Sequence, residues 1–244
     1  MKNLIFLLLL CFSISGYAQN STYMQWQNYV ITPHYDKLQD FGEAMNEHNK
    51  MYHQTAATAA SVWRVDTGPN VGKWVLSSGP YTFSHMDTVS MADGHMSHWR
   101  NTVMPTIAHI EDGGIWRMYN DHSYIPQNMQ ITKARVVVHK TNSDAMDGYF
   151  DAMKKLTEAT AQGQPTMARI LLDRVGFHND GRDKVVFIGL NNWGQLDNGI
   201  GNVYEEVHGE GTWDLFLEQV NHGIKSSYEE HWTFIPFLSG IGGN

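Results

Sequence analysis

An internal repeat is the feature that most constrains how this chain folds. A β-rich run followed by a stretch with helical spacing occurs twice, shifted by about 110 residues, first over 29–32 and 36–53 and then over 135–139 and 143–161. Within the two helical stretches, similar residues fall at matching places. The pairs are Phe41 with Tyr149, Ala44 with Ala152 and Met45 with Met153. The sequence therefore predicts two copies of one structural unit.

The remainder of each copy follows the same order. Two β-rich runs surround a turn, at 60–65 and 73–77 in the first copy and at 168–172 and 184–188 in the second. A second helix follows, containing Trp99 or Trp213, and each copy ends in a strand at 115–119 or 231–235. The order is β-α-β-β-α-β, which usually gives a four-stranded antiparallel sheet with both helices on one face. The other face is apolar, and two such sheets can cover each other.

We therefore expect an α+β protein made of two ferredoxin-like repeats, residues 19–125 and 126–244, which form a pseudo-dimeric α/β barrel. This organisation resembles the dimeric α/β-barrel superfamily in its tandem fused form, which includes antibiotic-biosynthesis monooxygenases, NIPSNAP-like proteins and haem-binding chlorite dismutases. The resemblance spans nearly all of residues 24–238 and rests on element order, without a diagnostic motif. It implies a small hydrophobic or aromatic ligand, held between sheet and helices or at the barrel centre.

The first 18 residues have the features of a cleavable secretory signal. Lys2 precedes an apolar run over 4–12, and Gly16 and Ala18 form a small-x-small site, so we expect cleavage before Gln19. The run is shorter than the roughly 20 apolar residues that span a bilayer. Cys11, the only cysteine, lies inside this segment, so the mature chain has no disulfide. These features predict a secreted or periplasmic protein without a membrane partner after cleavage.

The charge of the chain argues against polyanionic partners. The formal net charge is −8, and no run of five or more basic residues occurs. Phosphate backbones and anionic membrane surfaces require clustered Lys and Arg. We therefore exclude nucleic acid as an expected partner, and association with a further copy of the chain stays open.

The segment 85–109 is rich in His and Met and is the densest candidate for a metal or haem site. If residues 92–110 are helical, Met91, His95 and His98 share one face, and His85 lies upstream. Imidazole and thioether suit copper, and imidazole also suits zinc or haem iron. The simpler interpretation, which the lack of an established metal motif favours, is that the Met residues pack on the sheet and the His residues face solvent.

Two further groups of residues are candidates for a ligand pocket. His34 and His139 end the first strand of each copy, where an imidazole could act as a general base or simply face solvent. Arg64 and Arg169 lie at similar places on later strands and could bind an anion, and Trp63 and Trp74 could line a pocket or belong to the core. Five glycines between 189 and 209 predict a loop of about twenty residues.

Together these patterns predict an exported small-molecule-binding protein, with cofactor-independent monooxygenase-like chemistry as its enzymatic form. A metal- or haem-binding protein using segment 85–109 and a non-catalytic partner-binding module are the alternatives. The sequence identifies no cofactor and does not decide whether the protein is an enzyme.

Overall fold

The computed structural model describes residues 23–88, 92–176 and 181–240. The predicted signal and Met91 lie outside these residues. The strands are β1 (Gln25–Pro33), β2 (Ala60–Thr67), β3 (Trp74–Tyr81), β4 (Ile107–Met118), β5 (Lys133–Thr141), β6 (Ala168–Arg174), β7 (Lys184–Leu190) and β8 (Ile224–Phe234). The α-helices are α1 (Leu38–Tyr52), α2 (Phe83–Thr88), α3 (His95–His98), α4 (Met146–Gly163), α5 (Gly201–His208) and α6 (Thr212–Gly223).

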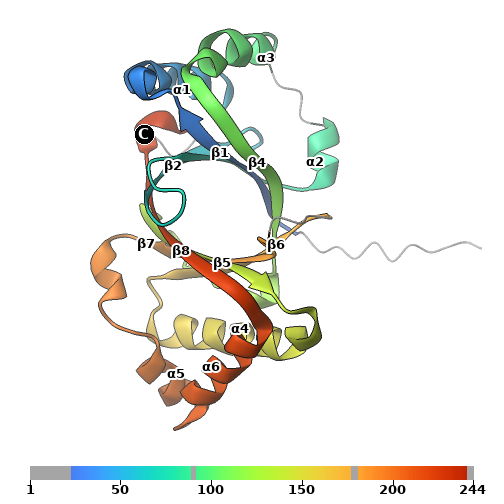
Figure 1. Cartoon of the computed structure of the whole chain (residues 1–244), viewed down its shortest axis with the longest axis vertical. Helices are drawn as coiled ribbons and strands as arrows, with labels where there is room; N and C mark the ends of the chain where they lie inside the picture. Colours follow the sequence, from blue (N-terminus) through green and yellow to red (C-terminus); the bar gives the residue numbers. More distant parts are fainter. Residues whose placement is uncertain (1–22, 89–91, 177–180, 241–244) are drawn as a thin grey trace, which may run out of the picture.

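The strands form one closed antiparallel barrel with helices outside it (Figure 1). The first four strands lie in the order β4-β1-β3-β2, and the last four in the corresponding order β8-β5-β7-β6. Pairing of β2 with β8 and of β4 with β6 joins the two groups and closes the ring. The predicted α+β class and barrel are confirmed. Below, the first half means β1 to β4 with their helices, and the second half means β5 to β8 with theirs.

Side chains fill the inside of the barrel. Trp63 packs there against Phe187 with 5.7 Å between ring centroids, and Val65, Trp116 and Val136 belong to the same buried cluster. A cavity of only about 60 Å³ remains. The barrel centre therefore has no room for an aromatic ligand, which leaves the space between sheet and helices.

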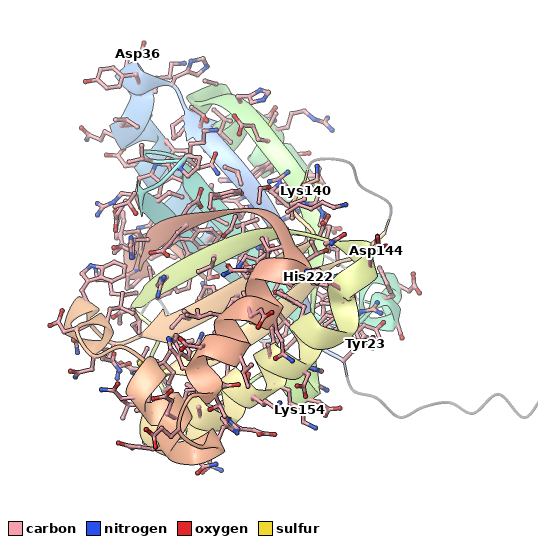
Figure 2. The ribbon with its side chains drawn as sticks, turned by 60° about the horizontal axis from the view of Figure 1, so that its bottom comes forward. Tyr23, Asp36, Lys140, Asp144, Lys154 and His222 are labelled. Carbon is pink, nitrogen blue, oxygen red and sulfur yellow. The ribbon has the colours of Figure 1, made fainter. Side chains whose placement is uncertain are left out.

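In the second half, packing closes the space between sheet and helices, and the cavity of about 380 Å³ in this half is lined by residues of α4, α5 and α6 alone. Figure 2 shows α4 and α6 lying side by side over the strands. Tyr149, Tyr204 and Phe216 are buried between the sheet and α4, α5 and α6. Residues 189–209 are not the continuous loop that their glycines predict, because they include a 3-10 turn (Trp193–Leu196) and α5. Tyr204 on α5 is buried in the core, and this burial stabilises the helix despite the flanking glycines.

In the first half, the segment after β3 is broken into short pieces. The expected continuous helix over 92–110 is wrong: α3 passes into a π-helical turn (Trp99–Val103) and a 3-10 turn (Met104–Thr106), and β4 begins at Ile107. Pro105 lacks the N–H that an α-helix requires at that point, which favours the change. His109 therefore lies on a strand, and the predicted strand 115–119 is the end of the longer β4.

Across the described residues, no helix has both the length and the apolar character needed to cross a bilayer.

Candidate functional site

The broken helical segment leaves a cavity of about 420 Å³ in the first half, between α1, α2, α3 and the outer face of the sheet. We call it the first-half cavity. Its walls combine apolar and aromatic side chains with several imidazoles and a few hydroxyl groups. It is lined by Gln27, Tyr29, His48, His53, Ala57, Thr58, Ala59, Leu76, Ser78, Gly79, Tyr81, His85, Met86, His95, Met96, Trp99 and Ile110.

Two of the imidazoles come from α1 and the residue after it. Phe41, Met45 and His48 follow helical spacing on the face that packs against the sheet, and His48 is only 1% exposed. His53 is the C-cap of α1, and its backbone N–H donates to the Asn49 carbonyl. The histidine one turn from the end of α1 and the histidine at its cap therefore face the same cavity.

The C-terminal segment of the chain fixes this end of α1. The Asn49 side-chain amide donates to the Leu238 carbonyl at 2.5 Å. A Cβ at Gly240 would lie 2.1 Å from the His53 carbonyl oxygen, so only glycine allows the two backbones to approach this closely. The segment after β8 thus holds α1 and His53 in place from outside the cavity.

Two further imidazoles come from the start of the broken segment. Gly94, with φ of 85°, begins α3 in the left-handed region, which glycine tolerates best. His95 and His98 follow on the first turn, and Trp99 opens the π-helical turn. Such turns occur often at functional sites. The Trp99 ring lies 5.2 Å from the His48 ring, so the turn contributes both an aromatic wall and two imidazoles.

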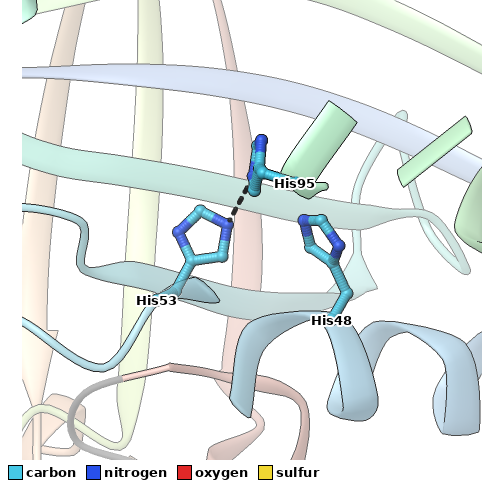
Figure 3. A group of neighbouring side chains, drawn as sticks. All are labelled: His48, His53 and His95. Carbon is cyan, nitrogen blue, oxygen red and sulfur yellow. Dashed lines mark hydrogen bonds between the residues drawn. The ribbon is translucent and has the colours of Figure 1, made fainter. Parts of the chain in front are cut away.

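Four imidazoles, His48, His53, His95 and His98, form what we call the histidine cluster. His53 Nε2 is 3.3 Å from His95 Nε2, and His48 Nδ1 is 3.2 Å from His98 Nδ1. Potential ligand atoms of His48, His53 and His95 all lie within 4.8 Å of one another. Figure 3 shows these three rings converging from α1 and from the start of α3.

Hydrogen-bond partners determine where two of the protons lie. His53 Nδ1 is 2.6 Å from the Thr58 carbonyl, which can only accept, so Nδ1 carries the proton and Nε2 keeps its lone pair. On the other side, Glu47 Oε1 is 3.5 Å from His98 Nε2. With the His98 proton on Nε2, its Nδ1 accepts from His48 Nδ1–H, which leaves His48 Nε2 with a lone pair.

The environment keeps His48, His53 and His95 neutral at pH 7. Burial lowers the pKa of His48 to about 3, and the neighbouring His53, His95 and His98 contribute in the same direction. Burial also lowers the pKa of His53, although its hydrogen bond to Thr58 opposes the change. Burial, with His53 and His98, lowers the pKa of His95. Neutral imidazoles can accept protons or bind metal ions.

Among the described residues of the cavity wall, two polar atoms are buried without a hydrogen-bond partner, the Tyr81 hydroxyl oxygen and His95 Nδ1. Buried polar groups are usually satisfied, so each exception needs an explanation. Burial raises the pKa of Tyr81 to about 12, with a smaller contribution from Tyr29, so the phenol stays a donor at neutral pH. A ligand that offers an acceptor to Tyr81 would satisfy it.

The structure brings the three histidines predicted from segment 85–109 to the same region, in different roles. His95 belongs to the converging group of three with His48 and His53. His98 is outside this group and contacts His48 through the Nδ1 atoms of the two rings. His85 lines the cavity on α2, its Nε2 is 2.8 Å from the Ala57 carbonyl, and its ring stacks on Tyr81.

The two strand-end histidines lie outside the cavity. His34 is exposed, and its backbone N–H donates to the Thr106 carbonyl. His139 is buried on β5 in the second half, where its Nδ1 is 2.9 Å from the Tyr149 hydroxyl. Neither position gives the imidazole access to a ligand in the first-half cavity.

Of the four residues predicted to bind a ligand, Arg64 lies opposite Trp74 in the pairing of β2 with β3, but none of the four lines the first-half cavity. Arg64 is exposed and pairs with Asp66 at 2.7 Å, and Arg169 is buried in the second half, donating to the Thr160 hydroxyl at 2.8 Å. Trp63 fills the barrel, and Trp74 packs on Phe41 beneath α1. These tryptophans belong to the core, as their second interpretation had it.

Sequence reasoning missed His48, His53 and Tyr81. One signal was present: His48 falls on the apolar stripe of α1, where a polar residue needs a reason to be buried. Tyr81 gave no such signal, because an aromatic residue at a strand end is commonplace.

No family model and no curated protein sequence matches this chain. Solved structures do match it. A candidate monooxygenase from Lactobacillus acidophilus is similar over 87% of this chain and 94% of its own, with a TM-score of 0.57 and 10% identity. An anthrone oxidase-like protein is similar over 88% of this chain and 92% of its own, with a TM-score of 0.51 and 10% identity. A chlorite dismutase variant from Candidatus Nitrospira defluvii is similar over 87% of this chain and 92% of its own, with a TM-score of 0.51 and 9% identity.

The chain has the dimeric α/β-barrel fold. At these identities the likeness extends to the fold alone, and the dimeric α/β-barrel fold carries several chemistries. What this member of the fold does must therefore be argued from its own cavity.

Proposed function

We propose that this protein is an exported small-molecule-binding protein whose first-half cavity holds one small, mostly apolar or aromatic ligand. The observation that carries the proposal is the cavity itself. Its volume of about 420 Å³ is of the size that small ligands occupy. Leu76, Trp99 and Ile110 offer apolar contact, and the unpartnered Tyr81 hydroxyl offers one donor. We therefore assign the ligand a carbonyl or hydroxyl oxygen that accepts from Tyr81.

We further propose that the chain is a tandem duplication in which one copy kept its cavity. The matching strand orders of the two halves support this view. In the second half, Tyr149, Tyr204 and Phe216 occupy the space between helices and sheet. One ligand per chain follows from this asymmetry.

Monooxygenase-like chemistry is the enzymatic form of this proposal, and the names of the solved neighbours support it. Neutral imidazoles at the cavity wall can take a proton from an activated ligand carbon, and the resulting carbanion can react with oxygen. With anthrone as the ligand, the balanced reaction consumes one O₂ and gives anthraquinone and water. Oxygen uptake that depends on anthrone and stops in a cavity-blocked variant is the expected result.

The proposal is tested by calorimetric titration of the purified protein with anthrone, a flat tricyclic ketone. Ala59 lines the cavity and Ala56, three residues earlier in the same loop, is exposed and does not. We expect binding of one anthrone per chain, loss of binding in Ala59→Trp, and unchanged binding in Ala56→Trp. Equal affinity in both variants would place the binding elsewhere and contradict the proposal.

Replacing Tyr81 by Phe isolates the polar contact. The substitution removes one oxygen that has no protein partner, so folding stability should hold or rise slightly. Affinity for anthrone should fall by about 3- to 10-fold, because a neutral hydrogen bond contributes about 0.5–1.5 kcal/mol. Affinity for anthracene, which lacks the oxygen, should be unaffected. Equal losses for both compounds would show that Tyr81 acts through packing alone.

A further inference from the structure

We propose that His48, His53 and His95 form a binding site for one late first-row transition-metal ion, Cu²⁺ or Zn²⁺, at the wall of the first-half cavity. The proposal goes beyond ligand binding and does not depend on it, because it concerns the affinity of the protein for the ion alone.

The spacing of the imidazoles fits such an ion. Two nitrogen ligands at about 2.0–2.1 Å from one tetrahedral ion are about 3.3 Å apart. His53 Nε2 and His95 Nε2 are 3.3 Å apart, and the ligand atom of His48 lies within 4.8 Å of both. The three residues come from the end of α1 and the start of α3, and Asn49 and Gly94 fix these ends. The pair is therefore already at chelating distance, and the third ring lies beside it.

The outer hydrogen bonds prepare two of the three rings as ligands. Metal-binding histidines generally donate their second N–H to a carbonyl or carboxylate, which fixes the lone pair of the other nitrogen toward the ion. The Thr58 carbonyl does this for His53. For His48, the acceptor is His98 Nδ1, and Glu47 holds the His98 proton on the opposite nitrogen, Nε2. His98 thus supports a ligand without being one, which differs from its predicted role.

His95 completes the set without such a partner. Because His53 Nε2 carries a lone pair, His95 Nε2–H is the donor of the 3.3 Å hydrogen bond between them. Binding of an ion requires this proton to move to His95 Nδ1, which has no hydrogen-bond partner among the described residues. A solvent-facing histidine at the start of a helix would need no such arrangement. The convergence of three buried or half-buried imidazoles, two with fixed lone pairs, is the observation that points to an ion.

The donor set selects the class of ion. Three imidazoles suit zinc and copper, whereas magnesium and calcium require oxygen ligands. No carboxylate lies among the described residues that line the cavity. The Met86 and Met96 side chains line it too, and thioethers favour copper. Three protein ligands leave a fourth position, which faces the cavity, as in catalytic rather than structural zinc sites.

The test uses the purified protein, stripped with a chelator and titrated separately with Zn²⁺, Cu²⁺ and Mg²⁺. We expect one Zn²⁺ or Cu²⁺ per chain and no Mg²⁺. His53→Ala and His95→Ala should each weaken binding at least about 100-fold, since even outer-shell changes cost about 10- to 100-fold. His98→Ala should weaken it about 10-fold. His34→Ala, at an exposed histidine that does not line the cavity, should leave it unchanged. Absence of stoichiometric Zn²⁺ and Cu²⁺ binding would overturn the proposal.

A second measurement serves if an alanine variant fails to fold. Co²⁺ bound to the unmodified protein should give the intense visible bands of a four-coordinate ion, and azide should shift them by entering the open position. Weak octahedral bands, insensitive to azide, would overturn the three-imidazole assignment. Ala59→Trp separates the two proposals, because it should abolish anthrone binding while metal stoichiometry stays at one.

Discussion

Lowering the pH from 7 to 4 is expected to remove several kcal/mol from the free energy of unfolding. His139 is 5% exposed, and burial lowers its pKa to about 4. In the unfolded chain its pKa is about 6.5, so between pH 6.5 and 4 the unfolded state binds a proton that the folded state does not. Stability is therefore full above pH 6.5 and falls as the pH drops. One tenfold change in proton affinity is about 1.4 kcal/mol, so His139 alone accounts for about 3 kcal/mol at pH 4.

His48 acts in the same direction, since burial lowers its pKa to about 3. The two contributions can be separated by a substitution at His139. The groups around His139 are the Tyr149 hydroxyl on α4 and, opposite it on β7, Lys184, whose ammonium pairs with Asp173. The backbone N–H of Asp183 also donates to the His139 carbonyl, but the Asp183 carboxylate accepts from the Thr141 backbone N–H and hydroxyl. Burial is therefore the cause of the lowered His139 pKa.

Urea unfolding at a series of pH values measures the effect, with His139→Gln as the matched variant. Gln cannot titrate in this range and keeps a polar partner for Tyr149. The variant should lose about 3 kcal/mol less stability than the unmodified protein between pH 7 and 4. Identical pH slopes would contradict the prediction, because they would show that His139 has the same pKa in the folded and unfolded states.

Much of the fold follows from periodicity. Strands and main helices lie where alternating and 3.6-residue patterns predict them, because burying one face of each element is the largest favourable contribution to folding. In the second helix of the first half, Pro105 marks a break that the sequence shows, but periodicity does not predict the π-helical turn before it. The pattern of apolar and polar side chains in residues 95–106 does not show where this turn begins. The π-helical turn forms where the Trp99 ring packs against the His48 ring, which is a tertiary contact.

The candidate site was predictable on one side only. His95 and His98 belong to the segment 85–109, whose many His and Met residues mark it in the sequence. His48 and His53 lie more than forty residues before His95, on and just after a helix whose pattern is that of an ordinary core helix. The C-terminal residues that hold His53, through Gly240, are more distant still. Contacts between residues so far apart depend on closure of the barrel by β8, which no local pattern in the sequence encodes.

Replacing His48 by Leu is expected to abolish high-affinity metal binding while leaving folding intact. Phe41 and Tyr149 are 108 positions apart, and the same offset from His48 leads to Leu156. Both residues are buried on the sheet-facing side of their helices, α1 and α4. The corresponding position on α4 is therefore already occupied by a buried leucine, so a leucine at position 48 is compatible with packing of the helix on the sheet. Zn²⁺ and Cu²⁺ affinity should fall at least about 100-fold, because one of three ligands is lost.

Stability at pH 7 should change by less than about 1 kcal/mol, since an imidazole and a leucine side chain have similar volumes and the apolar group has no desolvation cost. The reciprocal Leu156→His should lose at least about 2 kcal/mol, because the second half has no partner histidine at Ala161, the position that corresponds to His53. It should also gain no metal site. Retention of tight metal binding by His48→Leu would remove His48 from the ligand set. Unfolding of His48→Leu at neutral pH would instead show that the imidazole is needed for packing, and that the two helices are not interchangeable at this position.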